Sequence, residues 1–279
     1  MAVTIGLLHP GEMGSVVGEA LRAGGARVLW ASEGRSASTA KRASAAGLQD
    51  AGSVASVTRA SQVILSVCPP HAALDLARAV AAHGFTGLYV DANAVSPATT
   101  REIGGVVEKA GATFVDGGIV GPPPRQAGTT RLYLSGASAG RVAALCEAGP
   151  LEAIVLGGGL GTASAMKVAY ASWTKGSQAL LMTVRALAAA EGVEAALLAE
   201  WNRSQPGLAA RSEAAAQGTS RKAWRWIAEM EEIAATFAAA GLPDGFHQAS
   251  AEIYRRLEGY KDAKTAPSIE EVARALPRR

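Results

Sequence analysis

Residues 3–25 read VTIGLLHPGEMGSVVGEALRAGG and join a short apolar run, a loop with two glycines and an amphipathic segment. This order predicts a strand, a tight turn and a helix, the arrangement in which a pyrophosphate can lie on a helix N-terminus. Loops of this kind usually carry glycines in the order G-x-G-x-x-G. Here Gly11 and Gly14 take the second and third places, and His9 takes the first.

Each position of this loop has an expected task. Gly11 is expected to let the backbone approach the phosphates, and Gly14 to let the helix pack against the strand. His9 is expected to make the tight turn at a negative φ, with Pro10 stiffening it through its own fixed φ. A turn whose glycines serve packing alone is the alternative. The predicted cofactor contacts in this loop are His9, Pro10, Gly11, Glu12 and Met13.

The rest of the chain alternates in the same way up to about residue 160. Short aliphatic runs predict strands at 3–8, 26–31, 62–67, 87–92, 112–117, 131–136 and 152–157, and most gaps between them have helical periodicity. Such alternation predicts an α/β fold: an N-terminal Rossmann-type domain (1–160) with a parallel sheet covered by helices on both faces. After GGGLGTAS (157–164) the pattern predicts an all-α C-terminal domain (161–279), with helices at 163–191, 193–203, 206–217, 221–240 and 245–258.

The residues after the second predicted strand bear on the choice of cofactor. Dinucleotide sites for NAD place an acidic residue there for the ribose, whereas NADP sites use small polar and basic residues for the 2′-phosphate. Here Ser32 ends the strand, and Arg35 and Ser36 follow at a predicted helix start. This favours NADP over NAD, with Glu33 as a possible ribose ligand for NAD.

Composition and charge exclude several classes of protein. The net charge is +3 and the basic residues are scattered, so no basic stripe for nucleic acid is expected. No apolar stretch approaches a membrane span. The two cysteines, Cys68 and Cys146, have neither a C-x-x-C spacing nor a metal-like arrangement with the four histidines, which predicts reduced thiols, a cytoplasmic protein and no metal site.

Several further motifs, taken in order, resemble those of the β-hydroxyacid dehydrogenase superfamily, in a branch similar to 6-phosphogluconate dehydrogenase and 3-hydroxyisobutyrate dehydrogenase. The resembling stretches are GLLHPGEMG (6–14), CPP (68–70), DANAVSP (91–97), VDGGIVGPPPRQAGT (115–129) and GTASAMK (161–167). The resemblance implies an NAD(P)-dependent oxidoreductase acting on a small-molecule substrate. It places Cys68, Pro69, Pro70 and Asn93 near the nicotinamide, and Val120, Gly121 and Pro122 at the substrate.

The chain departs from the family pattern at three positions besides His9. Val120 stands where the family has a serine, so an anchoring hydroxyl for a substrate carboxylate is missing. Ala163 replaces the second glycine of the lysine motif, and Tyr170 replaces an asparagine. The reaction class is therefore expected to carry over, but not the usual small hydroxyacid substrates.

Lys167 is the expected catalytic residue. It is a lone charge in TASAMKVAYASW, at the junction of the two predicted domains, where apolar neighbours are expected to lower the pKa of its amine. Hydride transfer from an alcohol needs a group that takes the hydroxyl proton. Tyr170, three residues on, lies on the same helix face and is expected to orient the amine or the substrate. A lysine that only extends its amine to solvent is the alternative.

Three functions remain open from the sequence: an NADP-dependent alcohol or hydroxyacid oxidoreductase, an imine-reductase-like enzyme reducing C=N bonds, and a noncatalytic NADP-binding protein. Retention of Lys167 argues against the second. His247 is a further candidate for substrate binding, although a packed polar side chain is the more common role for such a residue. The long apolar helix that starts near Ala163 predicts a homodimer, because one small domain cannot cover it.

Overall fold

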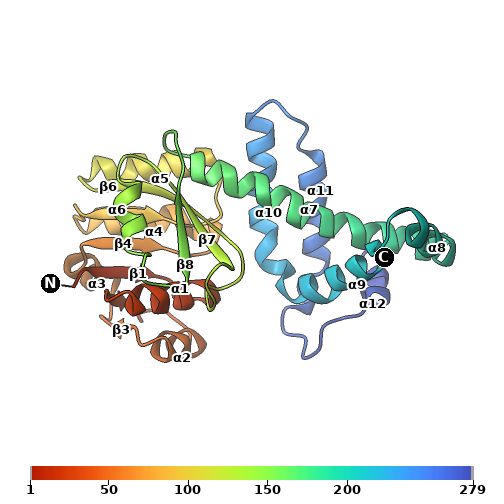
Figure 1. Ribbon diagram of the computed structural model, residues 1–279, viewed down its shortest axis with the longest axis horizontal. Coiled ribbons are helices and arrows are strands. Elements are labelled where there is room, and N and C mark those ends of the chain that lie inside the picture. Colours follow the sequence, from red (N-terminus) through yellow and green to blue (C-terminus); the bar gives the residue numbers. More distant parts are fainter. Residues whose placement is uncertain (1, 278–279) are drawn as a thin grey trace. The chain divides into compact units, whose positions relative to one another are not determined.

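The computed structural model describes residues 2–277 and divides into two compact units, the first ending at Val168 and the second beginning at Ala169. The first unit contains β1 (Thr4–Leu8), α1 (Glu12–Ala23), β2 (Arg27–Trp30), α2 (Ala37–Ala45), β3 (Gln49–Asp50), α3 (Val54–Ala60), β4 (Val63–Ser66), η1 (Pro70–Ala72), α4 (Ala73–Ala82), β5 (Leu88–Asp91), α5 (Pro97–Lys109), β6 (Thr113–Val120), β7 (Thr130–Ser135), α6 (Ala139–Ala144) and β8 (Leu151–Val155) (Figure 1). Helix α7 (Thr162–Ala190) begins in the first unit and continues into the second.

The strands form one sheet in the order β3-β2-β1-β4-β5-β6-β7-β8. Neighbours from β3 to β6 are parallel, as the alternation of strands and helices predicts. The pair β6 and β7 is antiparallel, which corrects the expectation of a wholly parallel sheet. The reason is local: loop 121–129 contains no helix that could carry the chain back across the sheet, so the next strand must run the opposite way.

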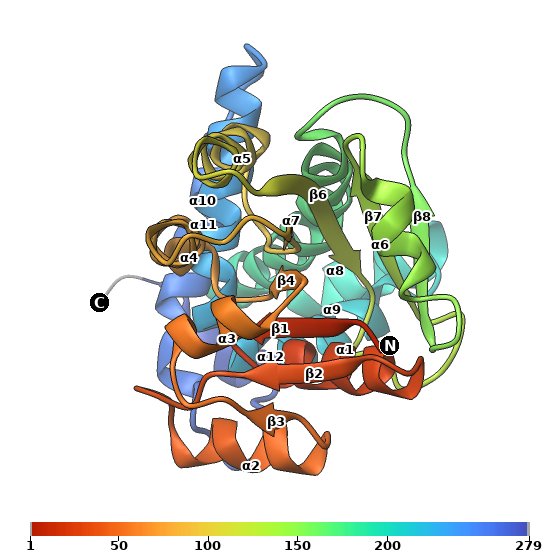
Figure 2. The same ribbon diagram turned by 90° about the vertical axis from the view of Figure 1, so that its left-hand side faces the viewer.

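Helices cover both faces of this sheet, and each face has its own apolar core (Figure 2). Side chains from α1, α2 and α6 pack on one face, for example Val17, Ala43 and Val142. Side chains from α3, α4 and α5 pack on the other. Adjacent residues of β1 alternate between the two cores, since Leu7 belongs to one and Leu8 to the other. A strand buried on both faces explains why VTIGLL lacks a polar alternation.

The second unit is helical, as predicted. It contains most of α7, then α8 (Glu194–Ser204), α9 (Leu208–Thr219), η2 (Ser220–Lys222), α10 (Ala223–Ala239), α11 (Gly245–Arg256), η3 (Glu258–Tyr260) and α12 (Ile269–Ala275). Helices α10 and α11 pack against each other, and the fully buried Met182, Met230 and Tyr254 are among the largest side chains of the unit's core. None of the helices within residues 2–277 combines the length and the apolar character that a membrane span requires.

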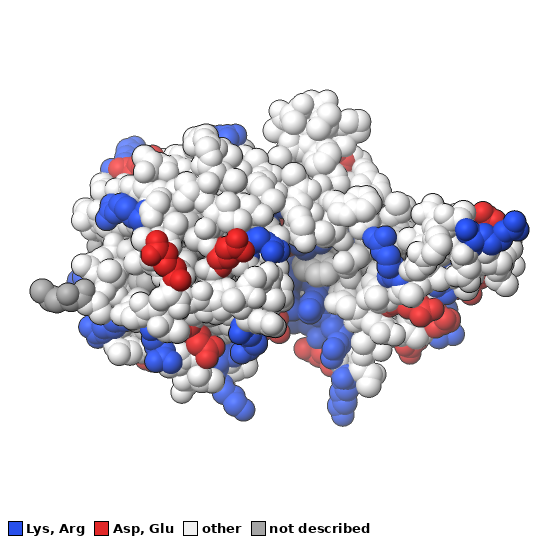
Figure 3. Space-filling model, in the orientation of Figure 1, with Lys and Arg blue, Asp and Glu red and all other residues white. Residues whose placement is uncertain are grey.

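Charged side chains of both signs are interspersed on the face shown in Figure 3, and no continuous basic stripe crosses it. This distribution agrees with the small net charge of +3.

Candidate active site

The loops that carry most of the predicted site follow strands whose carboxyl ends lie at the same edge of the sheet. Strands β2, β1, β4 and β5 are neighbours and parallel, so the segments after Trp30, Leu8, Ser66 and Asp91 meet there. In open α/β sheets, ligands bind in the crevice outside this edge. The sheet therefore gathers the glycine loop, the Arg35 segment and the Cys68 segment that the sequence singled out.

The glycine loop turns at His9, which has a φ of 69°. The expectation of a negative φ at this residue is wrong. The carbonyl of His9 accepts a hydrogen bond from the Gly11 N–H at 2.8 Å, so the chain reverses within three residues between β1 and α1. A left-handed backbone costs a non-glycine residue about 1–3 kcal/mol, although histidine adopts it more readily than most. A glycine would make the same turn without strain, which accounts for the residue usually found there.

Of the other two loop glycines, Gly14 has the predicted steric role, and the role of Gly11 at the phosphates stays a prediction. A Cβ atom at Gly14 would lie 2.6 Å from the His9 carbonyl oxygen, so only glycine allows α1 to pack this closely against the turn. At Gly11 an added Cβ would meet only the His9 imidazole, at 3.4 Å or more. Helix α1 also has no side-chain cap at its N-terminus. An open backbone and uncapped N–H groups fit the pyrophosphate of a dinucleotide.

Two guanidinium groups lie near this turn. Burial lowers the pKa of His9, and the nearby charges of Arg35 and Arg42 lower it further. Ser36 caps α2 by accepting a hydrogen bond from the Thr39 N–H at 3.3 Å, and Arg42 donates to the Thr39 hydroxyl at 3.1 Å. Hydroxyl groups and two arginines thus surround the start of α2.

Arg42 is a functional candidate that the sequence analysis did not include among the site residues. Its spacing of three residues from Thr39 on α2 is the signal that could have identified it. Ser32 is partly exposed, and its carbonyl accepts a hydrogen bond from the Arg35 N–H at 3.0 Å.

The buried side chain of Asn93 forms hydrogen bonds to the Cys68 segment and to the end of β4. Its Oδ1 accepts a hydrogen bond from the Cys68 N–H at 2.6 Å, and its Nδ2 donates to the Ser66 hydroxyl at 3.0 Å and to Asp91 Oδ1. The side chain is 3% exposed. Its place in the structure is that of a support for residues 68–70, and direct contact with a cofactor remains a prediction. Burial raises the pKa of Cys68 to about 12, so its thiol stays protonated at neutral pH.

Lys167 lies one turn into α7, half-buried, against strand β6. A Cβ atom added to Gly118 would lie 2.9 Å from both the Cβ of Lys167 and the carbonyl oxygen of Ala163, which shows how closely the helix approaches the strand. Tyr170 is three residues further along α7 and 43% exposed. The sequence reading missed Asp116 of β6, whose buried carboxylate holds the start of α7.

Of the three predicted substrate residues, Val120 is buried, Gly121 has no side chain and Pro122 is exposed. Val120 is 2% exposed at the end of β6, and Gly121 follows with a φ of 117°. The Pro122 carbonyl accepts a hydrogen bond from the Thr130 hydroxyl at 2.5 Å, which closes the loop. The contribution of these residues to a substrate site would come from the backbone and from the apolar ring of Pro122.

Two residues of the second unit have structural partners there. His247 is 5% exposed and packs its ring against Phe237 and Phe246, with centroid distances of 4.2 and 5.2 Å. Burial lowers its pKa, which favours the neutral imidazole. This packing favours a structural role, so we leave His247 out of the site proposed below. Lys175 forms a largely buried ion pair with Glu229 at 2.8 Å.

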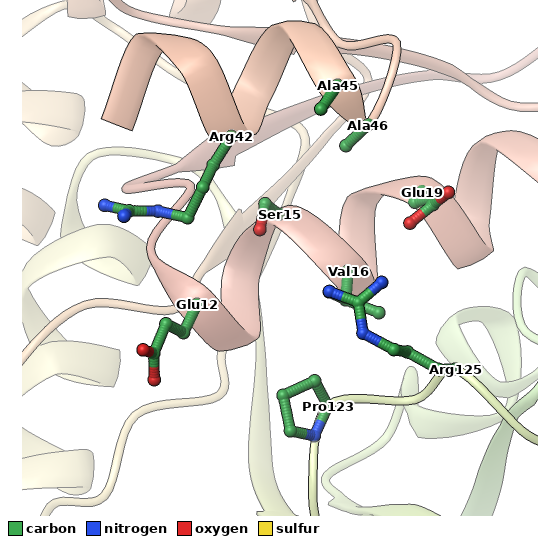
Figure 4. Close-up of a pocket in the computed structure, with 9 residues that line it drawn as sticks. All are labelled: Glu12, Ser15, Val16, Glu19, Arg42, Ala45, Ala46, Pro123 and Arg125. Atoms are coloured by element: carbon green, nitrogen blue, oxygen red, sulfur yellow. The ribbon is translucent and has the colours of Figure 1, made fainter. Parts of the chain in front are cut away.

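A pocket of about 340 Å³ lies beside the glycine loop (Figure 4). Figure 4 shows Glu12, Ser15 and Glu19 along α1, with Arg42 coming from α2 and Arg125 from the loop after β6. The predicted cofactor residue Glu12 lines this pocket with its side chain, which leaves its backbone N–H as the group suited to a phosphate. Within residues 2–277, no cluster of three or more histidine, cysteine or acidic side chains could hold a metal ion.

Two protein families match the chain. Residues 4–148, just over half of the 279 residues, match the NAD binding domain of 6-phosphogluconate dehydrogenase. Residues 188–257 match a domain of unknown function, DUF1932. An uncharacterised 28.5 kDa protein in the 7S RNA 5′ region of Methanothermus fervidus is 30% identical over 185 residues, which are 66% of this chain and 70% of the relative.

Solved structures with the same fold cover nearly the whole chain. A conserved protein of unknown function, described as similar to 3-hydroxyacid dehydrogenases, is 28% identical with a TM-score of 0.70, over 97% of this chain and 99% of its own. The 3-hydroxyisobutyrate dehydrogenase of Mycobacterium tuberculosis, solved with L-serine, is 19% identical with a TM-score of 0.70 over 100% of both chains. A reductive aminase of Aspergillus terreus, solved with NADPH and ethyl levulinate, is 17% identical with a TM-score of 0.58, over 99% of this chain and 100% of its own. The last two similarities concern the fold alone.

Proposed function

Because the chain belongs to the β-hydroxyacid dehydrogenase superfamily and is an NAD(P)-dependent dehydrogenase or reductase, we propose that it uses NADP(H) to interconvert a small alcohol or hydroxyacid and its carbonyl partner. Lys167 is the proposed proton-transferring residue. The observation that carries the proposal is the close packing of the Lys167 turn of α7 on β6, in the same unit as the open dinucleotide loop.

The residues of the first unit would hold the cofactor in a defined way. The Gly11 backbone and the uncapped N-terminus of α1 would bind the pyrophosphate, and Arg35, Ser36 and Arg42 would bind the 2′-phosphate. The nicotinamide, when bound, supplies or accepts the hydride. The proposed contacts of its ring are at Cys68, Pro69 and Pro70.

Lys167 would take the hydroxyl proton when an alcohol is oxidised and return it when a carbonyl is reduced. Tyr170, on the same helix face, would orient the amine or the substrate. Val120 brings no hydroxyl to the substrate segment, so a carboxylate anchor at that position is absent. This difference favours substrates other than the small hydroxyacids usual for the superfamily, and the choice between C=O and C=N bonds is an outcome of the experiment below.

The experiment is a spectrophotometric screen of NADPH oxidation against panels of aldehydes, keto acids and imines, repeated with Lys167→Met. The wild type should turn over a carbonyl substrate. The variant should keep NADPH affinity within a few fold and lose about a hundredfold or more in kcat. Turnover of imines only would replace the proposal with C=N reduction. NADPH binding without turnover of any compound would support the noncatalytic alternative, and near-normal turnover by the variant would exclude Lys167 as the proton-transferring residue.

We also propose that the protein is a cytoplasmic homodimer formed through α7. The helix leaves Tyr170, Trp173, Leu180 and Leu187 exposed at 43%, 68%, 48% and 62%, and spacings of three and seven residues place them along one side. Exposed apolar surface of this kind is typical of protein–protein interfaces. Light scattering should give twice the chain mass of 28.3 kDa, and Leu180→Glu should shift it toward one chain mass. A well-folded wild-type monomer at micromolar concentration would refute the dimer.

A further inference from the structure

The first turn of α7 is bound to β6 by one buried carboxylate. Asp116 is 0% exposed, and its Oδ2 accepts hydrogen bonds from the backbone N–H groups of Gly161, Ala163 and Ser164 at 3.0, 2.9 and 3.1 Å. These are the N–H groups that a helix start leaves without internal partners. A negative charge there also interacts favourably with the positive end of the helix dipole.

Two hydroxyl groups complete the set of donors around this carboxylate. Ser135 Oγ donates to Oδ2 at 2.8 Å, and Ser164 Oγ donates to Oδ1 at 2.6 Å. The Ser164 hydroxyl also lies 2.6 Å from that of Thr100 on α5. Every group bound directly to Asp116 is thus a donor, as an ionised carboxylate requires.

Strand β6 also contacts α7 at Lys167. Asp116 and Gly118 are two residues apart on β6, so both face α7, and they are separated by about 6.6 Å along the strand. Ala163 and Lys167 are one helical turn apart, about 6 Å along the axis. Because these two lengths match, Asp116 can bind the start of the helix while Gly118 lies beside Lys167. The distance from the ideal Cβ position of Gly118 to the Cβ of Lys167 is 2.9 Å.

We propose that Asp116 is a positioning residue for Lys167: it fixes the first turn of α7 on β6, and its negative charge raises the proton affinity of the Lys167 amine. The inference rests on the proposed function, in which Lys167 transfers the proton. Asp116 acts through the helix and its field, since its carboxylate is enclosed by its donors.

The experiment measures the apparent pKa of the Lys167 amine and needs no substrate. The intact protein, with NADPH present, is labelled by acetic anhydride across a pH series, and mass spectrometry follows the extent of labelling at each lysine. Asp116→Asn should lower the apparent pKa of Lys167 relative to the wild type, because a nearby negative charge that favours the protonated amine is lost. The exposed Lys109 is the internal control and should titrate as in the wild type.

Glu271→Gln is the matched control variant. It removes the charge of another helix-capping carboxylate, in the capping box of α12, and should leave the Lys167 titration unchanged. A Lys167 titration that stays at the wild-type value in a folded Asp116→Asn protein would overturn the proposal. An equal shift in Glu271→Gln would overturn it as well, because the effect would then not be specific to Asp116.

A second variant covers the case in which Asp116→Asn does not fold. The double variant Ser135→Ala, Ser164→Ala removes both hydroxyl donors but keeps the Asp116 carboxylate. The charge of the carboxylate is then screened by fewer hydrogen-bond dipoles. The apparent pKa of Lys167 should then rise, and an unchanged or lower value would contradict the proposal. Turnover is scored separately: if Lys167→Met keeps near-normal turnover, the proposed function fails whatever the labelling shows.

Discussion

Gly14→Ala tests whether close packing of α1 on the turn at His9 is what prepares the dinucleotide loop. The added Cβ would lie 2.6 Å from the His9 carbonyl oxygen, and ordinary contact begins at 3.4 Å, so the helix start must move by about 0.8 Å, the difference between the two distances. Such overpacking costs about 1–3 kcal/mol of unfolding free energy. A shift of this size also exceeds the spread of normal hydrogen-bond lengths, so a hydrogen bond from the start of α1 to a cofactor phosphate would be lost. Loss of one such charge-assisted bond corresponds to about ten- to hundredfold weaker cofactor binding.

Gly105→Ala is the control, because it makes the same substitution in helix α5 of the same unit. Gly105 is exposed, and apart from its chain neighbours and the backbone of its own helix no atom lies within 4 Å of its Cβ position. This control should raise the unfolding free energy by about 0.5–1 kcal/mol through helix propensity alone. Urea unfolding and a fluorescence titration with NADPH measure both variants. If Gly14→Ala is as stable as Gly105→Ala and binds NADPH like the wild type, the steric argument for this loop is refuted.

Three further predictions concern charge and strain. Arg35→Ala and Arg42→Ala should each weaken NADPH binding by about ten- to hundredfold and change NADH binding little, and equal affinity of the wild type for both cofactors in a direct titration would contradict the proposed preference. The lowered pKa of His247 means that, as the pH falls below about 6.5, the unfolded chain binds a proton that the folded chain does not, so the unfolding free energy should decrease from pH 7 to pH 5. Urea unfolding of His247→Phe should show a smaller decrease in unfolding free energy between pH 7 and pH 5. If the variant loses as much unfolding free energy as the wild type over this range, His247 is not the origin of the decrease. His9→Gly should raise the thermal midpoint, since glycine accepts a φ of 69° without strain; a lower midpoint would show that the imidazole contributes more than the turn costs.

Local patterns predicted most of the architecture correctly. The strand at Thr4–Leu8 and the helix at Thr162–Ala190 lie within one residue of their predicted bounds at each end, because hydrophobic period and glycine placement depend on neighbours in the chain. The steric need for Gly14 follows in the same way from a short strand–turn–helix sequence. The two-residue strand Gln49–Asp50 was not predicted, because it is exposed and too short to show a period.

The sequence by itself determined the order of strands and helices, the helical second half and the position of the dinucleotide loop, all of which depend on residues close together in the chain. Only the tertiary structure decided how side chains distant in sequence meet. The His9 turn takes a positive φ where β1 meets α1, and β7 reverses against β6. Asp116 reaches the N–H groups of residues 45 to 48 positions later, a pairing that no local period records. The physical reason is that a buried carboxylate must find donors, and the fold, not the neighbouring sequence, supplies them.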